Sequence, residues 1–220
     1  MTAKKGRKSK NRQAKKSQQT RQTLVSAARD VFADKGMSVA TIDDITNRAD
    51  LGKGTFYYHF KNKNGIIKAL MRQTLDELTS HIEERCKPAE GLEECLDLLI
   101  VAHLEFFDKR WKDYTLYFQG LAELTMAEGY DGLETPFIGY LQEIGSYLNR
   151  YIEYTLDQKV LENISCAVAG LVSGYYSFSV IASDDNNMLE AMKPMQIALV
   201  AGLTRFIKES IPKGASLVRW

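Results

Sequence analysis

The sequence predicts an all-α fold, and three observations support this class. Apolar residues recur at intervals of three and four along most of the 220 residues. The chain contains only 4 prolines, so few positions would interrupt such helices. Sustained strand-type alternation is missing, and 45% hydrophobic residues are enough to bury a core. We therefore expect helices throughout.

The first 20 residues differ from the rest in charge. The whole chain has a net charge of +1, but residues 1–21 contain basic residues and no acid. Because this segment is also rich in Gln, Ser and Asn, we expect residues 1–20 to form a disordered basic arm. Such an arm can follow the phosphates of a nucleic acid, enter a minor groove, or only aid solubility. Residues 1–21 contain nine basic residues, which are Lys4, Lys5, Arg7, Lys8, Lys10, Arg12, Lys15, Lys16 and Arg21.

Residues 21–66 are predicted to form three helices. Apolar spacing marks the first from Leu24 to Phe32, and a glycine follows it. Thr41 and Asp44 resemble a capping box at the start of the second. Residues 50–52 break the pattern, and a short third helix begins at Lys53. The order helix, tight turn, helix is typical of proteins that read the major groove of DNA.

The third helix has two contrasting faces. At about 100° per residue, Phe56 and Phe60 share one face, one turn apart. Tyr57 and Tyr58 fall on the opposite face, flanked by His59. Stiff side chains with hydroxyl and imidazole groups suit a polar, anionic partner, although a buried aromatic cluster is the alternative.

Residues from about 21 to 70 resemble the DNA-binding domain of the tetracycline-repressor (TetR) family. The resemblance departs from the family pattern at four positions, where the family usually has Ala, Gly, Ser and an acidic residue: Thr46, Asp50, Gly52 and Gly65. The positions that match in register are Ala28, Phe32, Gly36, Thr41, Ile42, Ile45, Ala49, the run KGTFYYHF from Lys53 to Phe60, Lys61 and Lys63.

The resemblance implies a role for each matching polar position. Contacts to base edges are expected from Lys53, Gly54, Thr55 and Tyr57. Contacts to phosphates are expected from Thr41, Tyr58, His59 and Lys63.

The resemblance implies that the remaining residues, 67–220, form a helical ligand-binding and dimerisation domain. A fourth helix follows a cap at Asn62 and reaches about Lys87, and further helices are expected at about 92–107, 114–127, 136–156, 159–183 and 188–211. This half is rich in aromatic residues, which suit either a plain core or a pocket for a small molecule. His103, on an apolar face, is either a ligand contact or a hydrogen-bonded core residue. The candidate ligand-binding residues are Phe107, Trp111, Tyr114, Phe118 and Tyr175.

Residues 164–183 carry no charge and contain Gly170 and Gly174 in a GxxxG spacing. Several serines dilute their hydrophobicity, so we interpret them as a buried helix and expect no membrane span. In the TetR family the last two long helices form the dimer interface. A two-fold dimer would place its recognition helices about 34 Å apart on a palindromic operator in double-stranded DNA.

The sequence offers little support for an enzyme. HExxH, paired metal-ligand cysteines and GxSxG are missing, so we expect no catalytic residues, no metal and no cofactor. The three cysteines are expected to be reduced thiols of a cytoplasmic protein, with a redox pair of Cys86 and Cys95 as the alternative to ordinary core packing.

We therefore expect a homodimeric, sequence-specific transcriptional regulator. The family resemblance implies a repressor that a small, largely apolar or aromatic effector releases from its operator, with activation left open. Two alternatives remain. One is a ligand-independent nucleoid-type DNA binder, and the other is a ligand carrier whose DNA-binding domain is idle.

Overall fold

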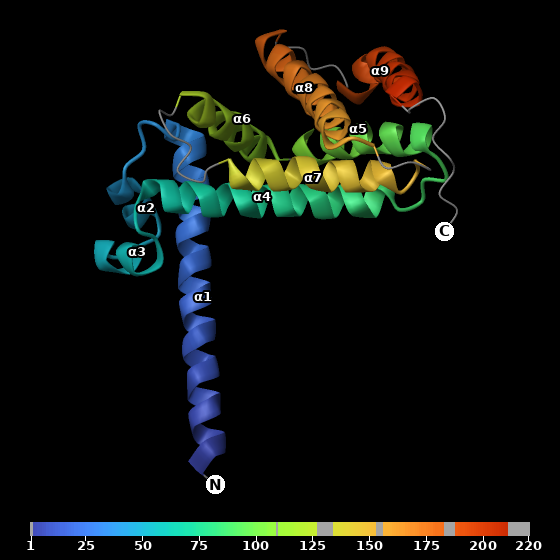
Figure 1. The fold of residues 1–220 in the computed structure, drawn as a ribbon. Coiled ribbons are helices and arrows are strands. Elements are labelled where there is room, and N and C mark those ends of the chain that lie inside the picture. The colour runs from blue at the N-terminus through green and yellow to red at the C-terminus, as the bar shows by residue number, and fades with distance from the viewer. Residues whose placement is uncertain (1, 109, 127–133, 153–155, 183–187, 211–220) are drawn as a thin grey trace. The chain divides into compact units, whose positions relative to one another are not determined.

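The computed structural model describes residues 2–108, 110–126, 134–152, 156–182 and 188–210 (Figure 1). All regular structure in these residues is helical, which confirms the predicted all-α class. The helices are α1 (Thr2–Lys35), α2 (Ile42–Arg48), α3 (Lys53–His59), α4 (Lys63–Cys86), α5 (Leu92–Asp108), α6 (Trp111–Met126), α7 (Thr135–Asn149), α8 (Gln158–Ala182) and α9 (Met188–Ser210).

The chain divides into two compact units. The first unit comprises residues 1–74 and 112–134, and the second comprises 75–111 and 135–220. Helix α4 contributes residues to both, and α6 belongs almost wholly to the first unit although it follows α5 in the chain. The functional boundary expected at residues 66 and 67 stays a prediction.

The core of the first unit comes from the apolar positions that the sequence spacing identified. Leu24, Phe32, Ile45 and Phe56 are fully buried, which joins α1, α2 and α3. Their burial explains why two helices of seven residues each are stable, since isolated helices of that length are not.

Polar contacts tie α6 to α1 and to the loop that follows α1. Lys112 Nζ lies 2.6 Å from Asp30 Oδ1, and Asp113 Oδ1 lies 3.3 Å from Arg29 Nε. One turn and a half further on, Gln119 Oε1 accepts a hydrogen bond of 2.9 Å from the backbone N–H of Met37. These partners are more than eighty positions apart in the chain, so no local sequence pattern announces them.

The basic arm was expected to be disordered, and this prediction was wrong. Helix α1 is continuous from Thr2 (Figure 1). The side chains of residues 11–20 within this helix are largely exposed. The arm contains Ala, Lys, Arg and Gln, which favour helix, and it carries no proline. It also extends a helix that the core already holds, so it avoids the cost of nucleation.

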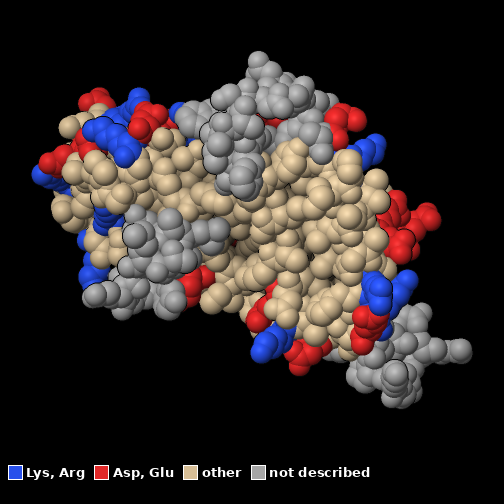
Figure 2. Space-filling model, turned by 90° about the horizontal axis from the view of Figure 1, so that it is seen from above, with Lys and Arg blue, Asp and Glu red and all other residues tan. Residues whose placement is uncertain are grey.

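The second unit is built from helices that bury one face each. Nine residues of α5 are buried, among them Leu96, Ile100 and Phe107. Helices α7 and α8 lie close together at Gly145. A Cβ added to this glycine would lie only 3.3 Å from Leu161 Cβ. Gln196 of α9 donates a hydrogen bond of 2.6 Å to an Asp97 oxygen on α5. Figure 2 shows Lys, Arg, Asp and Glu side chains in small groups, and uncharged residues cover most of the other described surface in that view.

Candidate nucleic-acid interface

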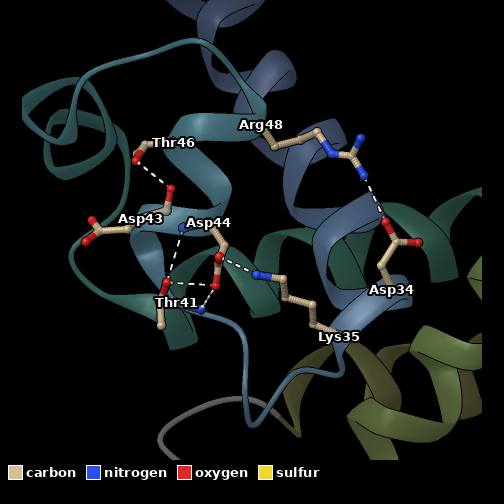
Figure 3. A network of polar contacts seen from close by, with 7 residues as sticks. All are labelled: Asp34, Lys35, Thr41, Asp43, Asp44, Thr46 and Arg48. Atoms are coloured by element: carbon tan, nitrogen blue, oxygen red, sulfur yellow. Dashed lines mark hydrogen bonds and ion pairs between the residues drawn. The ribbon is translucent and has the colours of Figure 1, made fainter.

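A complete capping box begins α2, as the sequence predicted (Figure 3). The backbone N–H of Asp44 donates to Thr41 Oγ1 at 3.1 Å, and the backbone N–H of Thr41 donates to Asp44 Oδ2 at 3.0 Å. The Thr41 hydroxyl also donates to Asp44 Oδ2 at 2.8 Å. The hydroxyl proton is therefore already used within the box, and a phosphate contact from Thr41 stays a prediction.

Ion pairs connect α2 to α1 on either side of this cap. Lys35 Nζ lies 2.5 Å from Asp44 Oδ1, and Arg48 lies 2.8 Å from Asp34 (Figure 3). Hydrogen bonds from Lys35 and then from Thr41 lower the pKa of Asp44 from 3.8 to about 2. The carboxylate is therefore ionised at neutral pH and holds the first turn of α2 against α1.

The turn between α2 and α3 fixes where the third helix begins. Asp50 adopts φ 51°, in the left-handed region where the resembling family usually has glycine. The N–H of Leu51 then donates to the carbonyl of Thr46 at 3.0 Å, which reverses the chain. Gly52 is the N-cap of α3, and no side chain caps it.

Helix α3 has the two faces that its sequence predicted. Phe56 is fully buried and Phe60 is 5% exposed, and their rings pack with centroids 5.7 Å apart. On the other face Tyr57 is 56% and Tyr58 is 77% exposed, which is unusual for side chains of that size. The apolar pair therefore anchors a helix whose aromatic, polar-tipped face meets solvent.

Lys53, Gly54 and Thr55 also lie on the accessible side. Lys53 and Gly54 are exposed, and Thr55 and His59 are half-buried. A Cβ on Gly54 would meet nothing within 4 Å, so the fold itself does not require glycine there. The absence of a side chain leaves the backbone of α3 open to close approach by a partner.

Lys53 is held by a neighbour in the free protein. Its Nζ lies 2.7 Å from Asp43 Oδ1, and this hydrogen bond raises the pKa of Lys53. Both side chains are more than half exposed, so the pair contributes little stability and a nucleic acid can displace it.

Lys63 has a structural role that the sequence did not reveal. Its ammonium donates to the backbone carbonyls of Met37 at 2.9 Å, Ser38 at 3.0 Å and Ala40 at 3.2 Å. An ammonium has three N–H donors, so these carbonyls use all of them. Lys63 thus closes the loop between α1 and α2, and this geometry counts against the predicted phosphate contact.

The candidate ligand-binding residues do not converge in one unit. Phe107 is buried in the second unit, where Tyr175 is half-buried. Tyr114 and Phe118 belong to the first unit, where their rings pack in a tilted arrangement with centroids 4.5 Å apart. The side chain of Trp111 lies outside the described residues. The pocket expected from these five residues stays a prediction.

A cavity of about 490 Å³ lies within the second unit, between α7 and α8. Its apolar lining includes Ile138, Leu141 and Leu161, and Asn149 and Glu162 add polar groups. None of the five candidate residues lines it. Its walls come from a helix pair whose spacing in the chain gave no sign of a cavity.

Two other features of the described residues bear on function. No group of three or more His, Cys, Asp or Glu in this part of the chain could hold a metal ion. Among the same residues, no helix is long and apolar enough to cross a membrane.

The fold and the α2–α3 geometry define a helix-turn-helix DNA-binding protein. A family model described as "Bacterial regulatory proteins, tetR family" matches residues 24–70. The Transposon Tn10 TetC protein of Escherichia coli is 25% identical over 91% of this chain and 98% of its own length. The uncharacterised HTH-type transcriptional regulator TtgW of Pseudomonas putida is 30% identical over 50% of this chain and 81% of its own length. Several other regulators match over about half of their length.

A solved structure supports the same fold. The transcriptional regulator FadR from Bacillus subtilis, in complex with stearoyl-CoA, has a TM-score of 0.59 at 19% identity, over 87% of this chain and 99% of that one. The chain belongs to the TetR family of transcriptional regulators.

Proposed function

We propose that the protein is a homodimeric repressor that binds a palindromic operator and leaves it when a small, largely apolar or aromatic effector binds. The observation that carries the proposal is the exposed aromatic face of α3 on a buried Phe56–Phe60 anchor. Tyr57, Lys53 and the open backbone at Gly54 would read base edges, and Tyr58 and His59 would hold phosphates. The protein would act in the cytoplasm, where its DNA partner is.

The basic helix α1 would add affinity without adding specificity. With its side chains an α-helix is about 10 Å across, whereas the minor groove of B-DNA is about 6 Å wide. The helical arm would therefore follow phosphates and would not enter the minor groove. This contribution weakens as salt rises, because it comes from the release of counterions.

Exposed apolar residues on α9 support dimerisation. Met195, Ile197 and Phe206 are 56%, 61% and 40% exposed, although large apolar side chains are normally buried. On α8, Asn163, Cys166 and Gly170 repeat at exposed helical positions, which would let another helix approach closely. We propose that these two helices pair with the same helices of a second copy.

The contacts of α6 offer a route from effector to DNA. Because Lys112, Asp113 and Gln119 tie α6 to α1 and to the loop before α2, a shift of α6 would be felt at the cap of α2. An effector that prefers the shifted arrangement would weaken operator binding by the same factor by which the operator weakens effector binding. Helix α4, which follows α3 directly, is a second route.

Selection of DNA by the purified protein tests the proposal. Random duplexes are incubated with the protein at about 150 mM salt, where non-specific contacts are weakened, and the retained DNA is sequenced. We expect an enriched palindrome with half-sites about one helical turn apart. The variant Tyr57→Ala should lose this enrichment while it stays folded.

Two other results would point to the alternatives. Binding without an enriched sequence that collapses as salt rises would favour a nucleoid-type binder that depends on α1. An operator that no effector releases would contradict ligand control. Long-chain acyl-CoA is a natural first effector to test, since the structurally similar FadR was solved with stearoyl-CoA.

A further inference from the structure

Two cysteines meet at the corner where α4 ends and α5 begins. Cys86 is the last residue of α4, and Cys95 lies in the first turns of α5. Both thiols are free, and both residues are buried, with 2% and 0% of their surfaces exposed. The DNA-binding function proposed above gives neither of them a role.

The Cys86 thiol lies against the backbone of Cys95. It donates a hydrogen bond to the Cys95 carbonyl oxygen, with Sγ 3.9 Å from that oxygen. The neighbouring Cys95 thiol lowers the pKa of Cys86, and Arg85 and Arg150 act in the same direction. The Cys86 thiol and burial together raise the pKa of Cys95. One sulfur is thus the better nucleophile, and its neighbour keeps its proton.

Hydrogen bonds of the backbone order the turn that connects Cys86 to Cys95. The N–H of Cys95 donates to the carbonyl of Gly91 at 2.9 Å, and the N–H of Ala89 donates to the carbonyl of Cys86 at 3.1 Å. The Tyr151 hydroxyl donates to the same Cys86 carbonyl at 3.3 Å. The connecting loop is short, and Lys87, Pro88 and Glu90 in it are exposed. A small oxidant needs only a local opening of this loop to reach the sulfurs.

We propose that Cys86 and Cys95 are a reversible oxidation site that forms an intramolecular disulfide with a peroxide as oxidant. The Cys86 thiolate attacks one oxygen of hydrogen peroxide, the O–O bond breaks, and Cys86 becomes a sulfenic acid while hydroxide leaves and takes up a proton as water. The Cys95 sulfur then attacks Cys86, the S–O bond breaks, and the Cys95 proton leaves with the hydroxyl group as a second water. The two thiols lose two electrons, which reduce the peroxide, and a dithiol reductant reverses the step.

The bond would close a loop of about ten residues and join two helix ends, which restricts the unfolded chain. Because Cys86 Sγ already reaches the backbone of Cys95, we expect the native backbone to need little adjustment. We expect the oxidised protein to melt roughly 5 °C above the reduced protein.

The test uses the full chain with Cys166→Ser, since the exposed Cys166 would otherwise form bonds between molecules. Reduced protein is treated with hydrogen peroxide, unfolded, alkylated with N-ethylmaleimide and weighed by mass spectrometry. We expect the protein to lose both alkylation sites together, to yield a peptide that links Cys86 to Cys95, and to regain both thiols in dithiothreitol.

Two matched variants make the result decisive. Cys86→Ser and Cys95→Ala each leave one thiol, so neither should form the linked peptide nor gain thermal stability from peroxide. Full alkylation of both sulfurs after peroxide, or their separate conversion to sulfinic acids, would overturn the proposal. Because the readout is thiol chemistry and melting, it is independent of whether an operator exists.

Discussion

The helix-turn-helix and the surroundings of His103 in the second unit place polar side chains differently. In the helix-turn-helix, most polar groups of α2 and α3 lie at the surface, where ion pairs such as Lys35–Asp44 and Lys53–Asp43 surround an apolar anchor. In the second unit, His103 is buried and hydrogen-bonded to other protein groups. The first arrangement leaves polar groups available to a partner. The second uses them to specify a core.

Truncation of the anchor of α3 should have the largest effect. Phe56 is fully buried between Tyr57 and Phe60, so Phe56→Ala should lower the free energy of unfolding by about 3–5 kcal/mol. Tyr58→Ala, two positions away on the exposed face, should leave stability nearly unchanged and weaken operator binding. Urea denaturation and fluorescence anisotropy measure the two quantities. Equal losses of stability in both variants would show that the two faces of α3 are not separate.

Protonation of His103 should cause the next largest loss in the free energy of unfolding. Its Nδ1–H donates to the Leu99 carbonyl at 2.6 Å, and its Nε2 accepts from the Tyr140 hydroxyl. Burial lowers the pKa of His103 from 6.5 to about 4, a bond to Leu99 opposes the change, and nearby His81 adds to it. In the unfolded chain His103 therefore becomes protonated below about pH 6.5. In the folded chain it stays neutral until the pH falls to about 4.

Stability from His103 should accordingly be complete above pH 6.5 and be lost as the pH falls toward 4. The expected loss is on the order of 3 kcal/mol. His103→Gln keeps a polar side chain and cannot titrate, so its free energy of unfolding should fall less over the same range. Parallel pH profiles for the two proteins would contradict the buried, neutral histidine and make the two units alike in this respect.

Lys63 differs from the surface lysines of the helix-turn-helix, because its ammonium donates to three backbone carbonyls. Lys63→Met should lower the free energy of unfolding by about 2 kcal/mol, since hydrogen bonds to a charged group are lost. Lys61→Met, at an exposed neighbouring position, is the matched control. A phosphate contact would instead reduce the slope of log affinity against log salt by about one. An unchanged slope for Lys63→Met would confirm its structural role.

How well the sequence predicted each region follows from the range of the interactions. The helix-turn-helix depends on neighbours, such as the Thr41–Asp44 box and the Phe56–Phe60 pair, so its helices and exposed face were predictable. The link between Met37 and Gln119 joins residues far apart in the chain, so nothing local encodes it. The placement of Tyr114 and Phe118 in the first unit, apart from Phe107 in the second, likewise depends on tertiary packing, which aromatic composition does not specify.

Residues 1–20 and His103 both show that the sequence predicts helical position better than it predicts packing partners. For residues 1–20, charge density suggested disorder, but helix propensity and continuity with a packed helix prevailed. For His103, the apolar spacing left a ligand contact and a core residue open, and its two hydrogen bonds favour the core residue. Position on a helix was predictable in both cases, whereas the partner was not.

The smallest expected effect lies in the turn that sets the angle between α2 and α3. Asp50 has φ 51°, which costs an L-residue with a side chain some strain, although Asp tolerates this region better than most. Asp50→Gly removes the strain but gives the unfolded chain more freedom, so the net gain should be only about 0.5–1 kcal/mol. Asp50→Ala lacks both the freedom of Gly and the local hydrogen bonding of Asp, so it should be less stable than the natural protein. Urea midpoints at equal slope should therefore rank Gly above Asp and Asp above Ala. A reversed order would mean that the Asp50 carboxylate, and not its backbone, sets the turn, and that this surface polar group is as structural as His103.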